Sequence, residues 1–515
     1  MFRSLSLRGL SVLLCALLLS FCTAVGTETD NPAAPEGVGF LRSSKAYLSS
    51  VEVSAPARER LQQGNRAFAV DIYRELSSAA ASDENLFLSP HSISTIMAMT
   101  YAGARGLTES EMAAALHFDL EQSALHPAMN ELSRHFGQVD EQSQLELRAL
   151  NSIWIQQGFP VEEDYLDVLS QQYDTGVYLV DYENDAEGAR GRINDWVFEQ
   201  TEERIDELLP LGSVSPQSVL ALTNTVYLSA EWADRFDEES TSEGVFTASN
   251  RDQITVEMMH RSWDYPFAIT PEYRAVGLPY KDANISMVCV MPNEGEFEAF
   301  TQEMSGDGLL EIVGSLAQSN MLSLSIPKFE FESAVDLKGA LTNLGMVDAF
   351  SEAGANFSGI ASEPPPLYIG TAVHKTYIGI DEKGTVAAAA TGEVLVPESI
   401  NPRITLDRPF IFFIWDHDTQ TVLFAGRLVR PAGPVAGQAA PPPTDAEIIC
   451  GILDECEGRT VSVQECVAGL EGEDPAILEQ CADCYAAEAD RCGGMTYCIC
   501  YDRSICADVC PARAI

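Results

Sequence analysis

The apolar positions of the chain predict helices and strands from residue 56 onward. Apolar residues recur at a spacing close to 3.6 after Pro56, which predicts an amphipathic helix (Leu61, Phe68, Ala69, Ile72 and Leu76). A second helix is predicted to begin at Ser89-Pro90, because serine caps a helix and proline fits its first turn. Apolar and polar residues alternate over residues 150–155, which predicts a strand.

The predicted helices and strands are interspersed along residues 56–431 and do not alternate strictly. Interspersed elements favour an α+β domain over a doubly wound parallel sheet. At 515 residues, the chain is long enough for one large domain with a sizeable core and for additional segments on either side of it.

Residues 382–399 break the pattern. Four consecutive alanines favour a helix, but Gly384 and Gly392 bracket them, and the neighbouring threonines and valine favour a strand. No apolar period places this stretch in a core. It is either an exposed loop or a segment that changes state, because its small side chains could enter between two existing strands and gain backbone hydrogen bonds.

The first 24 residues predict a secretory signal peptide. Two arginines precede an apolar run over residues 10–21, and small residues close the segment. This run is too short for the ~20 apolar residues that span a bilayer. The protein is therefore predicted to be secreted or otherwise extracytoplasmic. Residues 19–22 also resemble a lipoprotein cleavage box, although Phe21 stands where a small residue is usual, so a lipid anchor on Cys22 is an alternative.

Three further segments lie outside the predicted domain. Residues 25–55 show no period and are predicted to be a flexible tether, and residues 432–445 are a linker rich in proline, alanine and glycine. Residues 446–515 hold ten of the 13 cysteines (450, 456, 466, 481, 484, 492, 498, 500, 506 and 510). Such density in an exported module predicts a disulfide framework, with a zinc site through Cys481 and Cys484 as the alternative.

Charge and motifs exclude two classes of function. The chain carries 77 acidic against 31 basic side chains, so no nucleic-acid partner is expected, because phosphate binding needs a basic surface. The sequence has no zinc-protease helix, no nucleophile elbow and no phosphate-binding glycine loop, and its seven histidines are scattered. It is therefore predicted not to be an enzyme and to hold no cofactor or metal.

Several groups of residues follow the order and spacing of one family. They include Glu382-x-Gly384-Thr385-x-Ala387-Ala388-Ala389-Ala390-Thr391, Arg408-Pro409-Phe410 and Phe424-x-Gly426-Arg427, together with the stretches 85–99, 193–210 and 222–232. Over residues 56–431 the chain resembles the serpins. The resemblance implies an α+β fold of three β-sheets with surrounding helices and an exposed reactive-centre loop. The additional cysteine-rich module is absent from most serpins.

The resemblance also implies roles for individual residues. Four polar residues match the serpin "shutter", where the main sheet parts (Ser89, Ser92, Asn224 and His374). Three match the "breach" at the top of that sheet (Trp232, Lys328 and Glu382). The insertion hinge would comprise Glu382, Gly384, Thr385, Val386, Ala387, Ala388, Ala389, Ala390 and Thr391, where Val386 replaces the more usual glutamate. A buried histidine needs polar neighbours in any case.

Loop length in serpins places the cleaved bond 14 residues after Gly384, at Glu398–Ser399. The chain would then trap a serine protease as an acyl-enzyme, and Leu395, Val396 and Pro397 would occupy the specificity subsites. A pocket that accepts Glu398 needs cationic or hydrogen-bonding groups, which favours a glutamyl-specific protease. The alternatives are an elastase-like or cysteine protease acting at a shifted bond near Leu395–Val396, or a non-inhibitory scaffold whose tail binds a partner.

The expected partners follow from this interpretation. A target protease is expected, and the chain is predicted to be a monomer. Residues 107–148, which include the counterpart of a heparin-binding helix in some serpins, are acidic, so activation by a heparin-type polyanion is not expected. The partner of the cysteine-rich tail is not identified by the sequence.

Overall fold

The computed structural model describes residues 35, 37–142, 145–201, 205, 207–318, 321–362, 366–385 and 401–431. Several predicted features lie outside these residues: the signal peptide with Cys22, the first part of the tether, the linker, the cysteine-rich module, the hinge residues from Val386 to Thr391, and residues 395–399 with the predicted cleavage bond.

The described part of the chain forms helices interspersed with strands. The helices are α1 (Ala55–Ala79), α2 (Pro90–Tyr101), α3 (Gly106–Ala115), α4 (Gln122–Gln142), α5 (Glu163–Tyr173), α6 (Tyr182–Gln200), α7 (Phe297–Glu303), α8 (Gly306–Ser315) and α9 (Leu337–Asn343), with short 3-10 turns at Glu238–Ser240 and Asp348–Phe350. This order confirms the α+β class.

The strands form three sheets, as expected. The first holds β1 (Gly39–Leu41), β4 (Val177–Val180), β3 (Glu146–Gln156), β5 (Leu220–Glu231), β15 (Gly384–Thr385), β14 (Thr371–Ile380) and β13 (Phe329–Asp336), in that order. The second holds β11 (Ala317–Gln318), β8 (Pro266–Ile269), β9 (Tyr273–Pro279), β10 (Ile285–Pro292), β17 (Phe410–Asp416), β18 (Thr421–Leu428) and β2 (Leu86–Leu88). The third holds β16 (Arg403–Thr405), β12 (Leu322–Pro327), β7 (Gln253–Trp263) and β6 (Ser242–Thr247).

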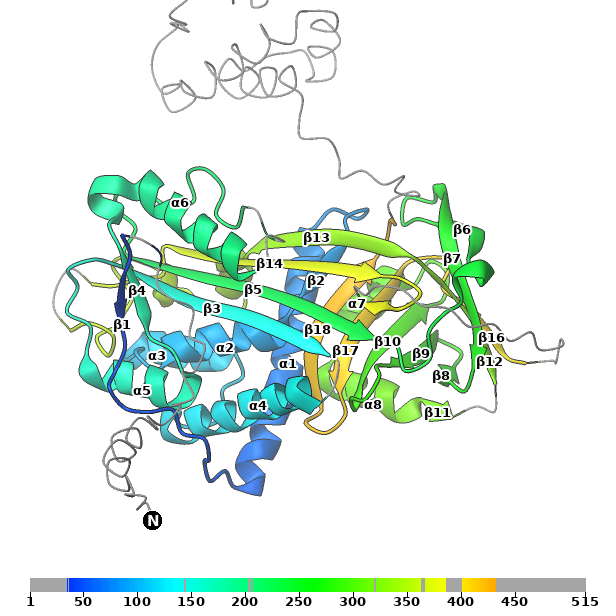
Figure 1. Ribbon diagram of the computed structural model, residues 1–515, viewed down its shortest axis with the longest axis horizontal. Coiled ribbons are helices and arrows are strands. Elements are labelled where there is room, and N and C mark those ends of the chain that lie inside the picture. Colours follow the sequence, from blue (N-terminus) through cyan, green and yellow to red (C-terminus); the bar gives the residue numbers. More distant parts are fainter. Residues whose placement is uncertain are drawn as a thin grey trace, which may run out of the picture. The chain divides into compact units, whose positions relative to one another are not determined.

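We call the first of these the main sheet. Figure 1 shows its long strands β13, β14, β5 and β3 side by side. Successive side chains of a strand point to opposite faces. Accordingly, Ile153 and Ile155 of β3 join the larger core, which includes α1 and α2, while Trp154 joins a smaller core with α6. The sheet is thus covered on both faces, which explains why all three residues are buried.

The two predicted helix starts agree with the structure. Helix α1 begins at Ala55, and the Ser54 side chain accepts a hydrogen bond from the Ala57 backbone N–H at 3.3 Å. Ser89 is the N-cap of α2, and its hydroxyl accepts from the Ser92 N–H at 3.2 Å. Both caps satisfy backbone donors that the first helical turn leaves without a partner.

Part of the predicted flexible tether is instead ordered structure. Strand β1 pairs antiparallel with β4, so that Phe40 lies opposite Tyr178, and the two rings contact at a centroid distance of 4.9 Å. Lys45 then pairs with Asp167 at 2.5 Å. The prediction was wrong here because a three-residue strand is too short to show a period.

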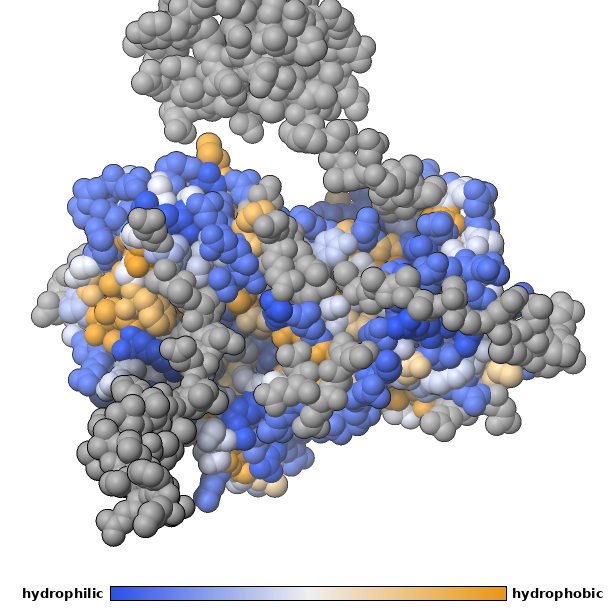
Figure 2. Space-filling view, viewed as in Figure 1, coloured by the Kyte–Doolittle hydropathy of each residue, from blue (hydrophilic) through white to orange (hydrophobic). Residues whose placement is uncertain are grey.

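The face of the molecule drawn in Figure 2 is largely polar. Figure 2 shows hydrophilic residues over most of this face, with hydrophobic ones gathered in small areas. Among the described helices, none combines the length and the apolar character that crossing a bilayer requires.

Candidate functional site

The candidate site is the boundary between β5 and β14 in the main sheet. These strands run parallel and pair directly from Thr371 opposite Ala221 to Thr376 opposite Val226. Beyond this stretch they separate, and β15 lies between them, antiparallel to both. The boundary is therefore closed over part of its length and already occupied by a third strand at one end.

A tight turn returns the chain from β14 into β15. The Asp381 carboxylate oxygen Oδ1 accepts from the backbone N–H groups of Lys383 at 2.8 Å and Gly384 at 3.1 Å. The Asp381 N–H in turn donates to the Gly384 carbonyl at 3.0 Å. Aspartate favours such turns because its short side chain can accept from the backbone two residues ahead. This turn sets Thr385 opposite Ile380 in the sheet.

The two residues of β15 fit a narrow space. A Cβ atom on Gly384 would lie 1.9 Å from the carbonyl oxygen of Ala230, so only glycine can pair there without moving β5. Thr385 is 1 % exposed, and its hydroxyl lies 2.8 Å from that of Tyr280. The start of the predicted hinge is therefore an integral part of the sheet.

Trp232 closes the end of the boundary. Its backbone N–H donates to the Lys383 carbonyl at 2.8 Å, and its indole Nε1–H donates to the Asp381 carbonyl at 3.0 Å. The indole ring stacks on Tyr280 at a centroid distance of 4.8 Å. Trp232 thus holds both the turn and the tyrosine that contacts Thr385.

Glu382 is held in the same turn by three groups. Its Oε2 lies 3.1 Å from Lys328 Nζ, its Oε1 accepts from the Thr241 hydroxyl at 2.7 Å, and its carbonyl accepts from the Phe236 N–H at 2.8 Å. Burial acts to raise the pKa of Glu382, but the hydrogen bonds and the Lys328 charge outweigh it and hold the pKa below its usual value. The three predicted breach residues therefore meet around one turn.

The predicted shutter residues meet where β5 and β14 pair directly. His374 Nε2 accepts from the Ser89 backbone N–H at 2.9 Å, while its Nδ1 hydrogen-bonds Oδ1 of Asn224, the residue opposite it on β5. Asn224 Nδ2 donates to the Ser92 hydroxyl at 2.5 Å. The Ser89 hydroxyl donates to the Leu423 carbonyl at 2.7 Å. This cluster ties both strands to the N-terminus of α2.

His374 is neutral in this arrangement. Burial lowers the pKa of His374 to about 3, although the bond to Asn224 opposes the change. The proton is assigned to Nδ1, because Nε2 accepts from Ser89 and Nδ1 faces a carbonyl oxygen. Charging the imidazole would place a second proton against the Ser89 N–H.

Several residues of the site were not predicted from the sequence. Asn151 of β3 lies opposite Asn224, and its Oδ1 accepts from Asn224 Nδ2 and from the Ser92 hydroxyl. Asp381, Thr241 and Tyr280 carried no signal, because the turn and the packing that use them involve residues far apart in sequence.

Comparison with known proteins identifies the family. A family model described as "Serpin (serine protease inhibitor)" matches residues 63–431. The chain belongs to the serpin family. The description of the family is that of a protease inhibitor and not of a catalyst, as predicted. The predicted family is confirmed for this part of the chain, whereas the cysteine-rich tail lies outside both the match and the described residues.

Relatives of this serpin come from distant organisms. A serpin-like protein of Methanosarcina acetivorans is 32% identical over 390 residues, which are 74% of this chain and 91% of that protein. A leukocyte elastase inhibitor of Xenopus tropicalis is 33% identical over 380 residues, 72% of this chain and 100% of that protein. The crystal structure of tengpin, a thermophilic serpin in its native state, is similar in fold, with a TM-score of 0.68 at 24% identity over 76% of this chain and 99% of that one.

Proposed function

We propose that this serpin is a suicide inhibitor whose reactive loop inserts between β5 and β14 after a protease cleaves Glu398–Ser399. The observation that carries the proposal is the position of β15, since Gly384 and Thr385 already form a strand between β5 and β14. Insertion of the following residues would only continue this strand.

The pairing of β15 defines the register of that continuation. Thr385 pairs with Ala230 of β5 and with Ile380 of β14, and both pairings are antiparallel. Each further residue of the inserted strand would therefore pair one residue further back along β5 and along β14. In this register Thr391 would enter between Asn224 and His374, which now pair with each other. Its hydroxyl could then replace the hydrogen bond that insertion breaks. The first residue of β14, Thr371, would pair with residue 394.

Insertion would exchange one parallel pairing for two antiparallel ones. The new strand would be antiparallel to both neighbours, as β15 is, and antiparallel pairs are the slightly more stable kind. Residues 386–394 would each add backbone hydrogen bonds worth about 1 kcal/mol net, on the order of 10 kcal/mol in total. This gain would drive the reaction forward once cleavage frees the loop.

Trapping follows from the distance that the cleaved end would travel. Glu398 is 13 residues beyond Thr385, which corresponds to roughly 43 Å of extended strand at about 3.3 Å per residue. A protease joined to Glu398 through an acyl bond would be carried along the sheet. Distortion of its catalytic groups would stop deacylation, because turnover depends steeply on their geometry.

Two classes of target protease fit the sequence of the loop. Glu398 favours a glutamyl-specific serine protease, whose pocket must supply cationic or hydrogen-bonding groups. Cleavage near Leu395–Val396 by an elastase-like enzyme is the second candidate, and the likeness to a leukocyte elastase inhibitor supports it. The two candidates predict different first residues of the released peptide.

The test is incubation of the mature protein with a glutamyl-specific and an elastase-like protease, followed by denaturing gels and mass spectrometry. We expect a covalent complex and a released peptide that begins at Ser399. The control is Thr385→Arg, because an arginine cannot enter the buried position of Thr385, so this variant should be cleaved without forming a complex. Cleavage without a complex by every protease, and without a rise in melting temperature, would favour a non-inhibitory scaffold.

We further propose that the protein is exported and that the ten tail cysteines form disulfides. Removal of residues 1–24 would leave 11 cysteines, of which Cys289 is free and buried, with a pKa raised by burial. Alkylation of the unfolded mature protein should then label one cysteine without reductant and 11 after reduction. Labelling of all 11 without reductant would favour the zinc alternative.

A further inference from the structure

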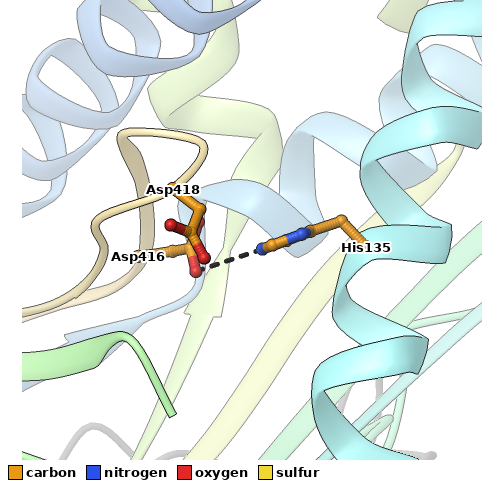
Figure 3. A group of neighbouring side chains, drawn as sticks. All are labelled: His135, Asp416 and Asp418. Atoms are coloured by element: carbon orange, nitrogen blue, oxygen red, sulfur yellow. Dashed lines mark hydrogen bonds and ion pairs between the residues drawn. The ribbon is translucent and has the colours of Figure 1, made fainter.

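A cluster of potential metal ligands comes from elements other than β5, β14 and β15. His135 comes from α4, Asp416 ends β17, and Asp418 lies in the turn before β18. Figure 3 shows the imidazole reaching across from α4 toward the two carboxylates. One ligand atom of each residue lies within 4.8 Å of the others. No local motif joins these residues, which is why the sequence predicted no metal site.

Neighbouring groups orient both carboxylates. Asp416 Oδ1 accepts from the backbone N–H of Thr419 at 2.7 Å and from its hydroxyl at 2.5 Å, and Oδ2 lies 3.2 Å from His135 Nε2. Asp418 Oδ1 accepts from Asn284 Nδ2 at 2.8 Å. Outer hydrogen bonds of this kind are what orient metal-binding carboxylates in proteins.

The cluster is also short of positive charge. Two carboxylates face one imidazole, so a negative charge would remain even if His135 were protonated. Within the described residues, the ion pairs of Asp416 and Asp418 include no lysine or arginine. The Asp416 side chain is 1% exposed, and charges at such a depth interact strongly because water screens them poorly.

A second imidazole packs against α4, next to the position of His135. His91 of α2 packs against Phe136 at a centroid distance of 4.9 Å, and its buried Nδ1 has no hydrogen-bond partner. Burial lowers the pKa of His91 to about 4, and the charge of Asp416 partly opposes this shift. His91 is therefore a neutral neighbour and is not one of the three potential ligands.

We propose that His135, Asp416 and Asp418 bind one divalent transition-metal ion, with Zn²⁺ preferred. One imidazole and two carboxylates suit Zn²⁺ better than Mg²⁺ or Ca²⁺, which prefer oxygen ligands alone. Zinc ligands at about 2.0–2.2 Å from the ion lie roughly 3.4 Å apart when tetrahedral, so side-chain adjustments of about 1 Å suffice. His135 is partly exposed and Asp418 is exposed, so the ion can enter from solvent.

A bound ion would join α4 to the turn between β17 and β18. These elements belong to distant parts of the chain, so the ion would act as a cross-link of the native fold. Because the unfolded chain does not bring the ligands together, binding would raise the melting temperature with increasing Zn²⁺ concentration.

The chain offers a matched control for a simple ion pair. His117 Nε2 lies 2.8 Å from Asp71 Oδ2, but the third group near that carboxylate is Arg74, at 3.7 Å, and not a second aspartate. The cation disfavours a metal ion there. His117→Gln should therefore leave zinc binding unchanged, whereas His135→Gln and Asp418→Asn should weaken it.

The experiment is equilibrium dialysis of the metal-free mature protein against Zn²⁺, with melting curves at each concentration. We expect the wild type and His117→Gln to bind one Zn²⁺ at the proposed site. His135→Gln and Asp418→Asn should lack this ion or bind it at least tenfold more weakly. Only the first two should be stabilised by this ion. Equal numbers, affinities and melting shifts in all four proteins would overturn the proposal.

The cysteine-rich tail could bind zinc as well, so the source of binding must be separated. Co²⁺ bound to thiolates gives intense near-ultraviolet charge-transfer bands, which an imidazole and two carboxylates do not give. Binding that produces these bands and survives His135→Gln belongs to the tail. If all Co²⁺ bound by the wild type were of this kind, the proposed site would be excluded. These readouts do not depend on inhibition of any protease.

Discussion

Replacement of Glu393 tests the proposed insertion register at a single side chain. In the register of β15, residue 393 would lie between Leu222 of β5 and Ala372 of β14. Its side chain would point to the same face as Thr385, because the two positions are an even number of residues apart. That face is the larger core, in which Leu222 is 1 % and Ala372 0 % exposed.

The expected effect can be worked out from this position. Burial without a partner raises the pKa of a glutamate by up to about 3–5 units, so Glu393 would enter the sheet in its protonated form. Protonation at pH 7 of a group with an ordinary pKa of about 4.3 costs about 4 kcal/mol. Leucine at this position avoids that cost and buries additional apolar surface, worth about 1.5–3 kcal/mol.

Glu393→Leu should therefore stabilise the cleaved protein by about 4 kcal/mol or more and leave the intact protein nearly unchanged. Guanidinium unfolding of both forms, before and after cleavage by the same protease, measures the difference. The cleaved wild type should also gain stability as the pH falls from 7 toward 5, because a raised pKa favours the protonated form, and the leucine variant should not. Equal stabilities and equal pH dependence would refute the register.

Three further predictions concern the described residues. Gly384→Ala should abolish formation of the covalent complex and turn the inhibitor into a substrate, because the added Cβ meets the Ala230 carbonyl. The control is Gly339→Ala, whose Cβ would have no atom within 4 Å. A normal amount of complex with the Gly384 variant would contradict this reasoning. Glu382→Gln should weaken the contact with Lys328 by about 1–2 kcal/mol and speed polymerisation on warming. Light scattering measures the polymerisation rate, and an unchanged rate would show that the turn does not limit opening of the main sheet. His374→Gln should reduce the loss of stability in acid. In the wild type, the contribution of neutral His374 to the free energy of unfolding is complete above the unfolded pKa of about 6.5 and is lost toward pH 3, at up to about 1.4 kcal/mol per pH unit. Urea unfolding of both proteins between pH 4 and 7 measures this difference, and parallel profiles would show that His374 titrates normally.

Local signals in the sequence predicted the elements that depend on local chemistry. The cap of α2 at Ser89 and the apolar stripe of α1 are examples, because a helix start and a buried helix face are encoded within a few residues. Strand β1 escaped prediction because its three residues are stabilised by β4, which lies far along the chain.

Some residues of the candidate site could likewise be predicted from the sequence, and others could not. Family resemblance pointed to Lys328 and Glu382, and the structure brings their charged atoms within 3.1 Å. Thr241 shares the same carboxylate but could not be predicted, since its hydroxyl acts through one side-chain contact that leaves no pattern in the sequence. His135 and Asp416 are a similar case, because only the fold brings α4 beside the end of β17.

The two polar clusters act on the same boundary in different ways. The shutter cluster bonds β5 to β14 through Asn224 and His374, so it opposes separation of the strands before insertion. The turn around Glu382 instead holds β15 between them, so it maintains an opening that has already begun. In the proposed register, Thr391 is the sixth residue beyond Thr385 to enter, so five residues precede it to the shutter. The bond that resists opening would therefore be broken late, when most of the new backbone hydrogen bonds already stabilise the inserted strand.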